Sequence, residues 1–235
     1  MRNAARHSPI FRKRKYVRIT LLCSDLLHPV NQYLARWVES NKHKYEISFV
    51  RTSRGLPGGE ILFLISCVEI LSKADRAAYK STLVLHASNL PSGRGWSPHI
   101  WEIIGGADQI TVSLVEAEDD VDSGRLWHQI TFPVPKDALW NEINSLLFDV
   151  EIRLIDLAVK EFEVISPVQQ DQNIEPTYFP RRKPADSKID PEISITSQFN
   201  RIRVCDPVRY PAYFELHGHR YKLILEKIID TLDLN

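Results

Sequence analysis

The sequence predicts an α/β fold built on a mostly parallel sheet. First, apolar strand-like segments alternate with amphipathic helix-like segments over residues 16–165, which is typical of strand–helix–strand units. Second, residues 61–67 are almost continuously apolar, as in a strand whose sheet is covered on both faces. Third, the 235 residues are 43% hydrophobic and 26% charged, a composition and length that suit one large globular domain.

Each expected element follows from a local pattern. Apolar and β-branched residues predict the strands, and apolar residues spaced three or four apart predict the helices. Ser72 is a suitable N-cap for one short helix, and Pro135 suits the first turn of a long one. In chain order we expect strand 16–23, helix 30–42, strand 45–51, a turn at 55–59, strand 61–67, helix 72–79, strand 82–86, helix 98–104, strands 109–116 and 126–132, and helix 135–162.

The composition changes after about residue 165. Seven of the 14 prolines lie between Pro167 and Pro211, which predicts a rigid, irregular segment. A short helix over 194–204 and a β-hairpin of 212–216 and 221–228, turning through 217–220, are expected next. The chain therefore divides into a basic, disordered arm (1–15), the main α/β domain (16–165) and a C-terminal extension with a helix and a β-hairpin (166–235).

The charge distribution bears on the possible partners. The net formal charge is zero, but residues 1–15 hold six basic and no acidic residues, which leaves −6 on the remainder. An acidic body is a poor partner for nucleic acid, and no apolar run is long enough to cross a bilayer. The basic arm could bind an anionic surface, but we interpret it as a disordered extension or the product of a misplaced start codon.

Three other features limit the chemistry. Cys23, Cys67 and Cys205 are too few and too widely spaced for a disulfide framework or a metal site, and we expect a cytoplasmic protein. The sequence lacks the G-x-G-x-x-G, P-loop, H-E-x-x-H and G-x-S-x-G motifs. His217 and His219 have no third ligand near them, so we interpret them as part of a polar turn and expect no metal.

One segment, LHASNLPSGRGWSPHIW (85–101), has the features of a site. His86 ends a buried strand, where open α/β sheets bind their ligands. The loop after it is rich in glycine and proline, and Asp122 follows 36 positions later, just before another strand. A carboxylate can fix the tautomer of a histidine and stabilise its imidazolium. We therefore predict His86 and Asp122 as a catalytic pair.

The pattern His-x-Ser-x-Leu-Pro, then Arg-Gly and Pro, then Asp-x-Gly, resembles the formyltransferases that use 10-formyltetrahydrofolate. That family includes enzymes acting on methionyl-tRNA, on glycinamide ribonucleotide and on nucleotide-linked sugars. The segments YFPRRKPADSKID (178–190) and IRVCDPVRYPAYF (202–214) are most similar to the sugar enzymes. The matching residues of the first pattern are His86, Ser88, Leu90, Pro91, Arg94, Gly95, Pro98, Asp122 and Gly124.

The resemblance implies a Rossmann-like formyltransferase fold, with 16–165 as the catalytic domain. It implies transfer of a formyl group from 10-formyltetrahydrofolate to the amine of a nucleotide-linked amino sugar, by default a 4-amino-4,6-dideoxy sugar for surface glycans. Methionyl-tRNA and glycinamide ribonucleotide remain alternative acceptors. The exposed edge of the terminal hairpin suggests a homodimer.

The resemblance also assigns binding residues around the pair. Two loops would hold the folate, largely through backbone groups. Arginine forks suit a diphosphate and aromatic faces suit a base. The folate set is Ser66, Cys67, Val68, Ile70, Leu71, Glu118 and Asp119, and the nucleotide-sugar set is Arg94, Tyr178, Arg181, Arg182, Arg203 and Tyr221.

Val84 departs from the family's Asn-x-His pattern. The resemblance gives that asparagine a part in holding the formyl oxygen, and loss of one such donor costs about 100–1000-fold in rate. Asn89 is the nearest asparagine, but we do not assign it this role. Three alternatives follow: another donor substitutes, the enzyme is slow, or the protein is a non-catalytic relative that still binds folate or nucleotide.

Overall fold

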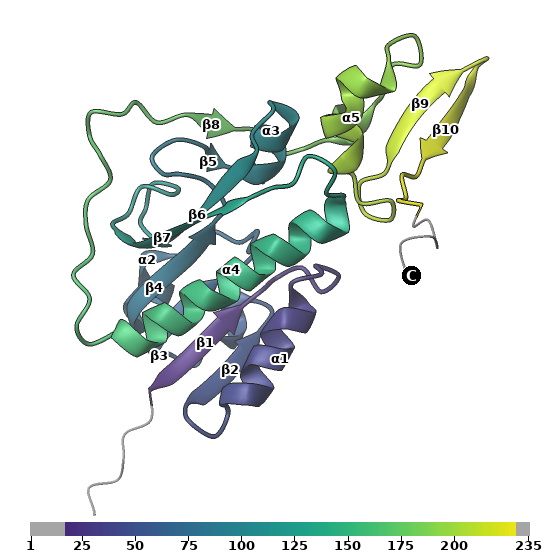
Figure 1. Cartoon of the computed structure of the whole chain (residues 1–235). Helices are drawn as coiled ribbons and strands as arrows, with labels where there is room; N and C mark the ends of the chain where they lie inside the picture. Colours follow the sequence, from purple (N-terminus) through teal and green to yellow (C-terminus); the bar gives the residue numbers. More distant parts are fainter. Residues whose placement is uncertain (1–16, 229–235) are drawn as a thin grey trace, which may run out of the picture.

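A computed structural model describes residues 17–228, so the expected basic arm over 1–15 lies outside the described residues. Helices and strands alternate along most of the chain (Figure 1). Their bounds are β1 (Arg18–Leu22), α1 (Asn31–Asn41), β2 (Glu46–Val50), η1 (Ser53–Gly55), β3 (Gly59–Leu64), α2 (Lys73–Ala77), β4 (Tyr79–His86), β5 (Arg94–Gly95), α3 (Pro98–Ile104), β6 (Gln109–Glu116), β7 (Leu126–Pro133), α4 (Trp140–Glu161), β8 (Tyr178–Phe179), η2 (Pro184–Ser187), α5 (Ile195–Arg203), β9 (Ala212–Leu216) and β10 (His219–Leu223).

The central sheet has the strand order β2-β1-β3-β4-β6-β7. β1, β2, β3 and β4 run parallel to one another, whereas β6 is antiparallel to both β4 and β7. The expected α/β fold with a mostly parallel sheet is therefore confirmed. Because the four parallel strands end at the same edge, the loops after β1, β3 and β4 gather beside His86.

The two faces of the sheet bury different cores. Ile19, Leu21 and Leu83 face a large core that also contains Leu34 of α1 and Leu154 of α4, all with less than 2% of their surface exposed. The opposite face buries a smaller cluster, formed by Leu22, Leu62, Leu64, Leu71 and Tyr79. Each fully buried aliphatic side chain contributes about 1.5–3 kcal/mol, so the larger core holds α1 and α4 on the sheet (Figure 1).

One local expectation agrees with the structure and two need correction. Ser72 caps α2 in a reciprocal arrangement with Asp75. The long helix α4 begins at Trp140 rather than Pro135, because the preceding residues form a turn and the Glu142 carboxylate caps the amide of residue 139. The terminal hairpin turns through two residues rather than four, because His217 and Gly218 both have positive φ angles, the geometry of a tight primed turn.

The segment after residue 165 returns to the sheet instead of leading directly away from it. Val168 pairs with Leu126 at the start of β7, and β8 pairs in parallel with β5. The hairpin β9–β10 projects from the far side of α5 (Figure 1). The division into three parts stays a prediction, but residues beyond 165 contact the loop that contains Asp122. Within 17–228, no helix has the length and apolar character needed to span a membrane.

A buried carboxyl on α4 predicts a pH-dependent stability. Glu151 is 7% exposed, its Oε2 has no hydrogen-bond partner, and burial raises its pKa to about 8. Between the pKa of Glu151 in the unfolded chain and about pH 8, the folded protein therefore keeps a proton on this carboxyl group that the unfolded chain has released. The resulting stability is fully present below the unfolded pKa and is lost as the pH rises from there through about 8.

We therefore expect Glu151→Gln to raise the melting temperature clearly at pH 8.5 and little at pH 5. Thermal unfolding of both proteins at the two pH values measures this. Asp149→Asn, on the exposed side of the same helix, is the control. An equal shift of the Glu151 variant at both pH values would contradict the prediction.

Candidate active site

His86 lies at the carboxyl end of β4 and is 5% exposed. Its Nε2 is 2.8 Å from the carbonyl oxygen of Gly93. Because a carbonyl oxygen can only accept a hydrogen bond, Nε2 carries a hydrogen and donates it. The other ring nitrogen, Nδ1, is therefore the one that can gain or lose a proton.

Asp122 lies beside that nitrogen. Its Oδ2 is 3.5 Å from His86 Nδ1 and accepts a hydrogen bond of 2.9 Å from the amide of Gly95. Both side chains are about 93% buried. The distance between His86 Nδ1 and Asp122 Oδ2 is longer than a hydrogen bond. A protonated His86 ring would nevertheless face two oxygen acceptors, the Gly93 carbonyl and the Asp122 carboxylate, and the carboxylate is charged. The structure thus brings the two predicted residues together in an arrangement suited to proton transfer.

Gln170 holds the Asp122 loop, and sequence reasoning missed it. Its Nε2 donates to the carbonyl oxygens of Asp122 (2.7 Å) and Gly124 (2.8 Å), and its Oε1 accepts from Arg94 (2.8 Å). Arg94 also contacts the Tyr178 hydroxyl at 3.2 Å. In this arrangement Arg94 stabilises the Asp122 loop through Gln170. The sequence instead predicts that the Arg94 guanidinium binds a diphosphate. No motif marks Gln170, because two of its partners are backbone atoms and the third, Arg94, lies 76 positions earlier in the chain.

Replacing Gln170 by alanine is expected to destabilise the protein and slow catalysis. The variant leaves two nearly buried carbonyl groups without a donor, which costs about 1–3 kcal/mol, and frees the Asp122 loop. Thermal unfolding measures the first effect, and the rate of the reaction proposed below measures the second. Gln169→Ala is the matched control because residue 169 is exposed; equal behaviour of the two variants would contradict this role.

The expected folate residues lie on two loops, one after β3 and one after β6, which is antiparallel to β4. Val68 and Ile70 are 53% and 85% exposed, whereas Leu71 is buried in the smaller core. The Cys67 thiol donates to a backbone carbonyl at 3.5 Å, and burial raises its pKa, so it is a poor nucleophile. On the second loop Glu118 is exposed, and Asp119 pairs with Arg76, which lowers the pKa of its carboxyl.

The expected nucleotide-sugar residues are dispersed. Tyr178 is 63% exposed, and the Arg181 guanidinium lies 4.8 Å from the ring centre of Trp96. Arg182 donates to Ser187 at 2.9 Å. Tyr221 stacks on a phenylalanine of the projecting hairpin, well away from the end of β4 (Figure 1).

Arg203 requires a correction. It is 2% exposed, and its guanidinium donates to the carbonyl oxygens of Pro135 (2.9 Å) and Ala138 (3.1 Å) and to the side chain of Asn200 (2.8 Å). These bonds connect α5 to the turn before α4. Arg203 therefore has a structural role, because these bonds occupy three of its five N–H donors.

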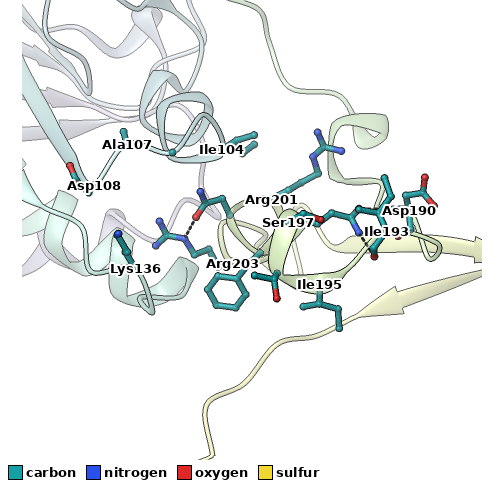
Figure 2. Close-up of a pocket in the computed structure, with 15 residues that line it drawn as sticks. Ile104, Ala107, Asp108, Lys136, Asp190, Ile193, Ile195, Ser197, Arg201 and Arg203 are labelled. Carbon is teal, nitrogen blue, oxygen red and sulfur yellow. Dashed lines mark hydrogen bonds between the residues drawn. The ribbon is translucent and has the colours of Figure 1, made fainter.

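A groove of about 930 Å³ lies between α5 and the end of α3 (Figure 2). Neither His86 nor Asp122 lines it. Apolar side chains such as Ile104, Ile193 and Ile195 alternate there with charged ones, including Lys136 and Arg201. The groove is thus a feature separate from the His–Asp pair.

Two further histidines lie near the pair. His28, in the loop after β1, accepts a hydrogen bond from the Val30 amide at Nδ1, and burial, with Arg209 nearby, lowers its pKa to about 4. His99, at the start of α3, has a buried Nδ1 without a partner, and its pKa is lowered to about 3 by burial, by His28 and His86, and by a nearby arginine. Each is an isolated histidine in sequence, so only the fold brings them together.

No family model matches the chain, but individual proteins do. The methionyl-tRNA formyltransferase of Natranaerobius thermophilus is 26% identical over 155 residues, which cover 64% of this chain and 49% of that protein. The enzyme of the same name from Lactococcus lactis subsp. cremoris is 28% identical over 149 residues, covering 63% and 46%. The chain spans about half the length of these curated relatives.

Solved structures share the fold. A methionyl-tRNA formyltransferase from Clostridium thermocellum superposes with a TM-score of 0.75 at 20% identity, covering 87% of this chain and 90% of that one. HypX from Aquifex aeolicus, in complex with tetrahydrofolic acid, gives 0.72 at 20% identity over 87% and 37%. A sugar N-formyltransferase from a Shewanella species gives 0.67 at 12% identity over 91% and 99%. The chain is thus similar in sequence to methionyl-tRNA formyltransferases over about 63% of its length, and it shares one fold with such an enzyme and with a sugar N-formyltransferase.

Proposed function

We propose that this protein transfers a formyl group from 10-formyltetrahydrofolate to the amine of a nucleotide-linked amino sugar. The observation that carries this proposal is the buried pair of His86 and Asp122, 3.5 Å apart at the carboxyl edge of the sheet. The family relationship supplies the reaction class. A 4-amino-4,6-dideoxy sugar used in surface glycans is the default acceptor.

Two observations favour a sugar over tRNA as the acceptor. Residues 16–235 carry a net charge of −6, and a polyanionic tRNA is bound through basic surfaces. The sugar N-formyltransferase from Shewanella also matches 91% of this chain in fold. Methionyl-tRNA and glycinamide ribonucleotide remain the alternatives within the same reaction class.

The two expected folate loops fit the formyl donor. Val68, Ile70 and Val121, which lie on these two loops, are each more than half exposed, and such apolar side chains can cover a flat ring system. Backbone groups of the same loops can supply the polar contacts. When bound there, 10-formyltetrahydrofolate supplies an activated formyl group.

His86 and Asp122 would move the proton that the reaction displaces. A bond forms between the acceptor nitrogen and the formyl carbon, the bond from that carbon to the donor nitrogen breaks, and the amine's proton ends on the donor nitrogen. His86 Nδ1 can take and return this proton, and Asp122 stabilises the charged ring while it does. General acid–base assistance of this kind contributes about 100–10,000-fold.

A thermal-shift panel followed by an activity assay tests the proposal. The panel contains 5-formyltetrahydrofolate with UDP, dTDP or GDP, alone and in pairs. A ligand at about 100 times its dissociation constant adds about 2.7 kcal/mol, or roughly 5–10 °C for a chain of this length. A shift with the folate and with one nucleotide, and turnover of the matching 4-amino-4,6-dideoxy sugar, would support the transferase. Turnover of methionyl-tRNA alone would overturn the sugar assignment.

The second candidate is a non-catalytic relative that binds folate or nucleotide. Val84 favours it, because this position lacks a hydrogen-bond donor. Binding of 5-formyltetrahydrofolate without turnover of any acceptor would support this candidate.

Two further assignments stay predictions: a cytoplasmic location and a homodimer. β9 and β10 form a separate two-stranded sheet, and Tyr221 and Ile224 are 43% and 51% exposed. A second copy could pair along such an edge. Light scattering measures the molar mass, and a monomer at micromolar concentration would contradict the dimer.

A further inference from the structure

Ser66 has an unusual backbone conformation beside His86. It follows β3 with a φ angle of 47°, in the left-handed region that a residue with a side chain seldom adopts. Leu64, the last residue of β3, is in register with Val84 of β4, so the loop that contains Ser66 leaves the sheet at the edge where β4 ends in His86. Parallel strands lie about 4.8 Å apart, which places Ser66 at the same edge as the reacting pair.

His28 orients the Ser66 hydroxyl. The amide of Val30 donates to His28 Nδ1 at 3.3 Å, so Nδ1 is unprotonated and Nε2 carries the hydrogen. Nε2 lies 3.0 Å from Ser66 Oγ and therefore donates to it. This tautomer cannot deprotonate the serine, so the two residues do not form a nucleophilic pair. Instead the hydroxyl keeps its own hydrogen for another acceptor, and Ser66 is partly exposed.

The other polar groups near His86 are less suited to bind the formyl oxygen. Val84 packs against an apolar cluster on its face of the sheet. Ser88 and Ser113 are 0% exposed, and the Ser113 hydroxyl already donates to a backbone carbonyl at 2.6 Å. Asn89 is exposed on the loop three residues after His86, and a hydrogen bond of 3.1 Å from a glutamine of β7 to its side-chain oxygen holds its amide beside β7.

We propose that the Ser66 hydroxyl donates a hydrogen bond to the formyl oxygen during transfer, with His28 as its positioning residue. This inference rests on the proposed function. Negative charge develops on that oxygen as the new carbon–nitrogen bond forms, and a donor already oriented there stabilises the transition state. A hydroxyl held from the side by a neutral imidazole is such a donor. The loop after β3 would then supply the donor that the side chain at position 84 of β4 lacks.

The test compares Ser66→Ala with Ser24→Ala. Binding is measured with 5-formyltetrahydrofolate, and turnover is measured with 10-formyltetrahydrofolate and the 4-amino-4,6-dideoxy sugar linked to the nucleotide that the panel selects. Ser24 is the matched control because its hydroxyl holds the same loop, donating to the Ser66 carbonyl at 3.5 Å and accepting from the Val68 amide at 2.9 Å. Ser66→Ala is expected to lower kcat by about 100-fold. Its dissociation constant for the folate should change by no more than about threefold, since the bond strengthens mainly in the transition state. Ser24→Ala is expected to weaken folate binding more than it lowers kcat.

His28→Phe tests the positioning role, because phenylalanine keeps the ring contact with Phe148 and removes the hydrogen bond. It should lower kcat in the wild-type background and have little further effect in Ser66→Ala. An unchanged kcat in Ser66→Ala, or a parallel loss of folate binding and kcat in it, would overturn the inference while the transferase assignment stands. Absence of turnover in the wild type would overturn both.

Discussion

Replacing His86 by glutamine is expected to reduce formyl transfer by about 100–10,000-fold, the usual contribution of a general acid–base group. The reason is that His86 Nε2 donates its hydrogen to the Gly93 carbonyl. Nδ1, which lies beside Asp122, is therefore the ring nitrogen that can exchange a proton with the substrate. Glutamine can still donate to the Gly93 carbonyl, so the fold should tolerate it. Single-turnover rates with saturating 10-formyltetrahydrofolate and amino sugar measure the effect.

The control for His86→Gln is His43→Gln, an exposed histidine after α1. Both variants should melt at nearly the wild-type temperature. Asp122→Asn is also expected to be slow, but it should add little to His86→Gln, because residues that act as one unit are not additive. Retention of wild-type rate by His86→Gln would rule out the proposed chemistry, and the binding-only alternative raised by Val84 would then be favoured.

Gly124→Ala is expected to be the most destabilising of the conservative changes considered. An added Cβ at Gly124 would lie 2.0 Å from the carbonyl oxygen of Glu116 and 2.8 Å from its carbonyl carbon. The strands cannot separate easily there, because the amide of Glu116 donates to the Arg125 carbonyl at 2.9 Å. Forcing an extra carbon into packed structure costs about 1–3 kcal/mol, and each kcal/mol lowers the melting temperature by roughly 2–4 °C in a chain of this length.

Because Gly124 lies two residues after Asp122, the same change should displace the carboxylate and slow transfer. Gly55→Ala is the matched control, since its added Cβ would make only ordinary contacts at 3.6 Å. Differential scanning calorimetry and transfer rates measure both effects. A Gly124→Ala protein as stable and as active as Gly55→Ala would show that the β6–β7 connection adapts without affecting the site.

The sequence was sufficient for the features that depend on local patterns. Apolar runs located the strands of the sheet, and Ser72 marked the start of α2, because capping and burial act through residues close in the chain. The position of His86 at a strand end and of Asp122 before the next strand followed from the same patterns. Their pairing followed from the tendency of open α/β sheets to bind ligands at the carboxyl edge.

Only the tertiary structure identified the polar contacts between residues that lie far apart in the sequence. Gln170 contacts the backbone of Asp122 across 48 positions, His28 meets Ser66 across 38, and Arg203 reaches the Ala138 carbonyl across 65. In two of these contacts the acceptor is a backbone oxygen, which every residue possesses, so the sequence contains no signal for it. The physical reason is that local propensity determines which segments become strands and helices, whereas long-range packing determines which polar groups share a buried space.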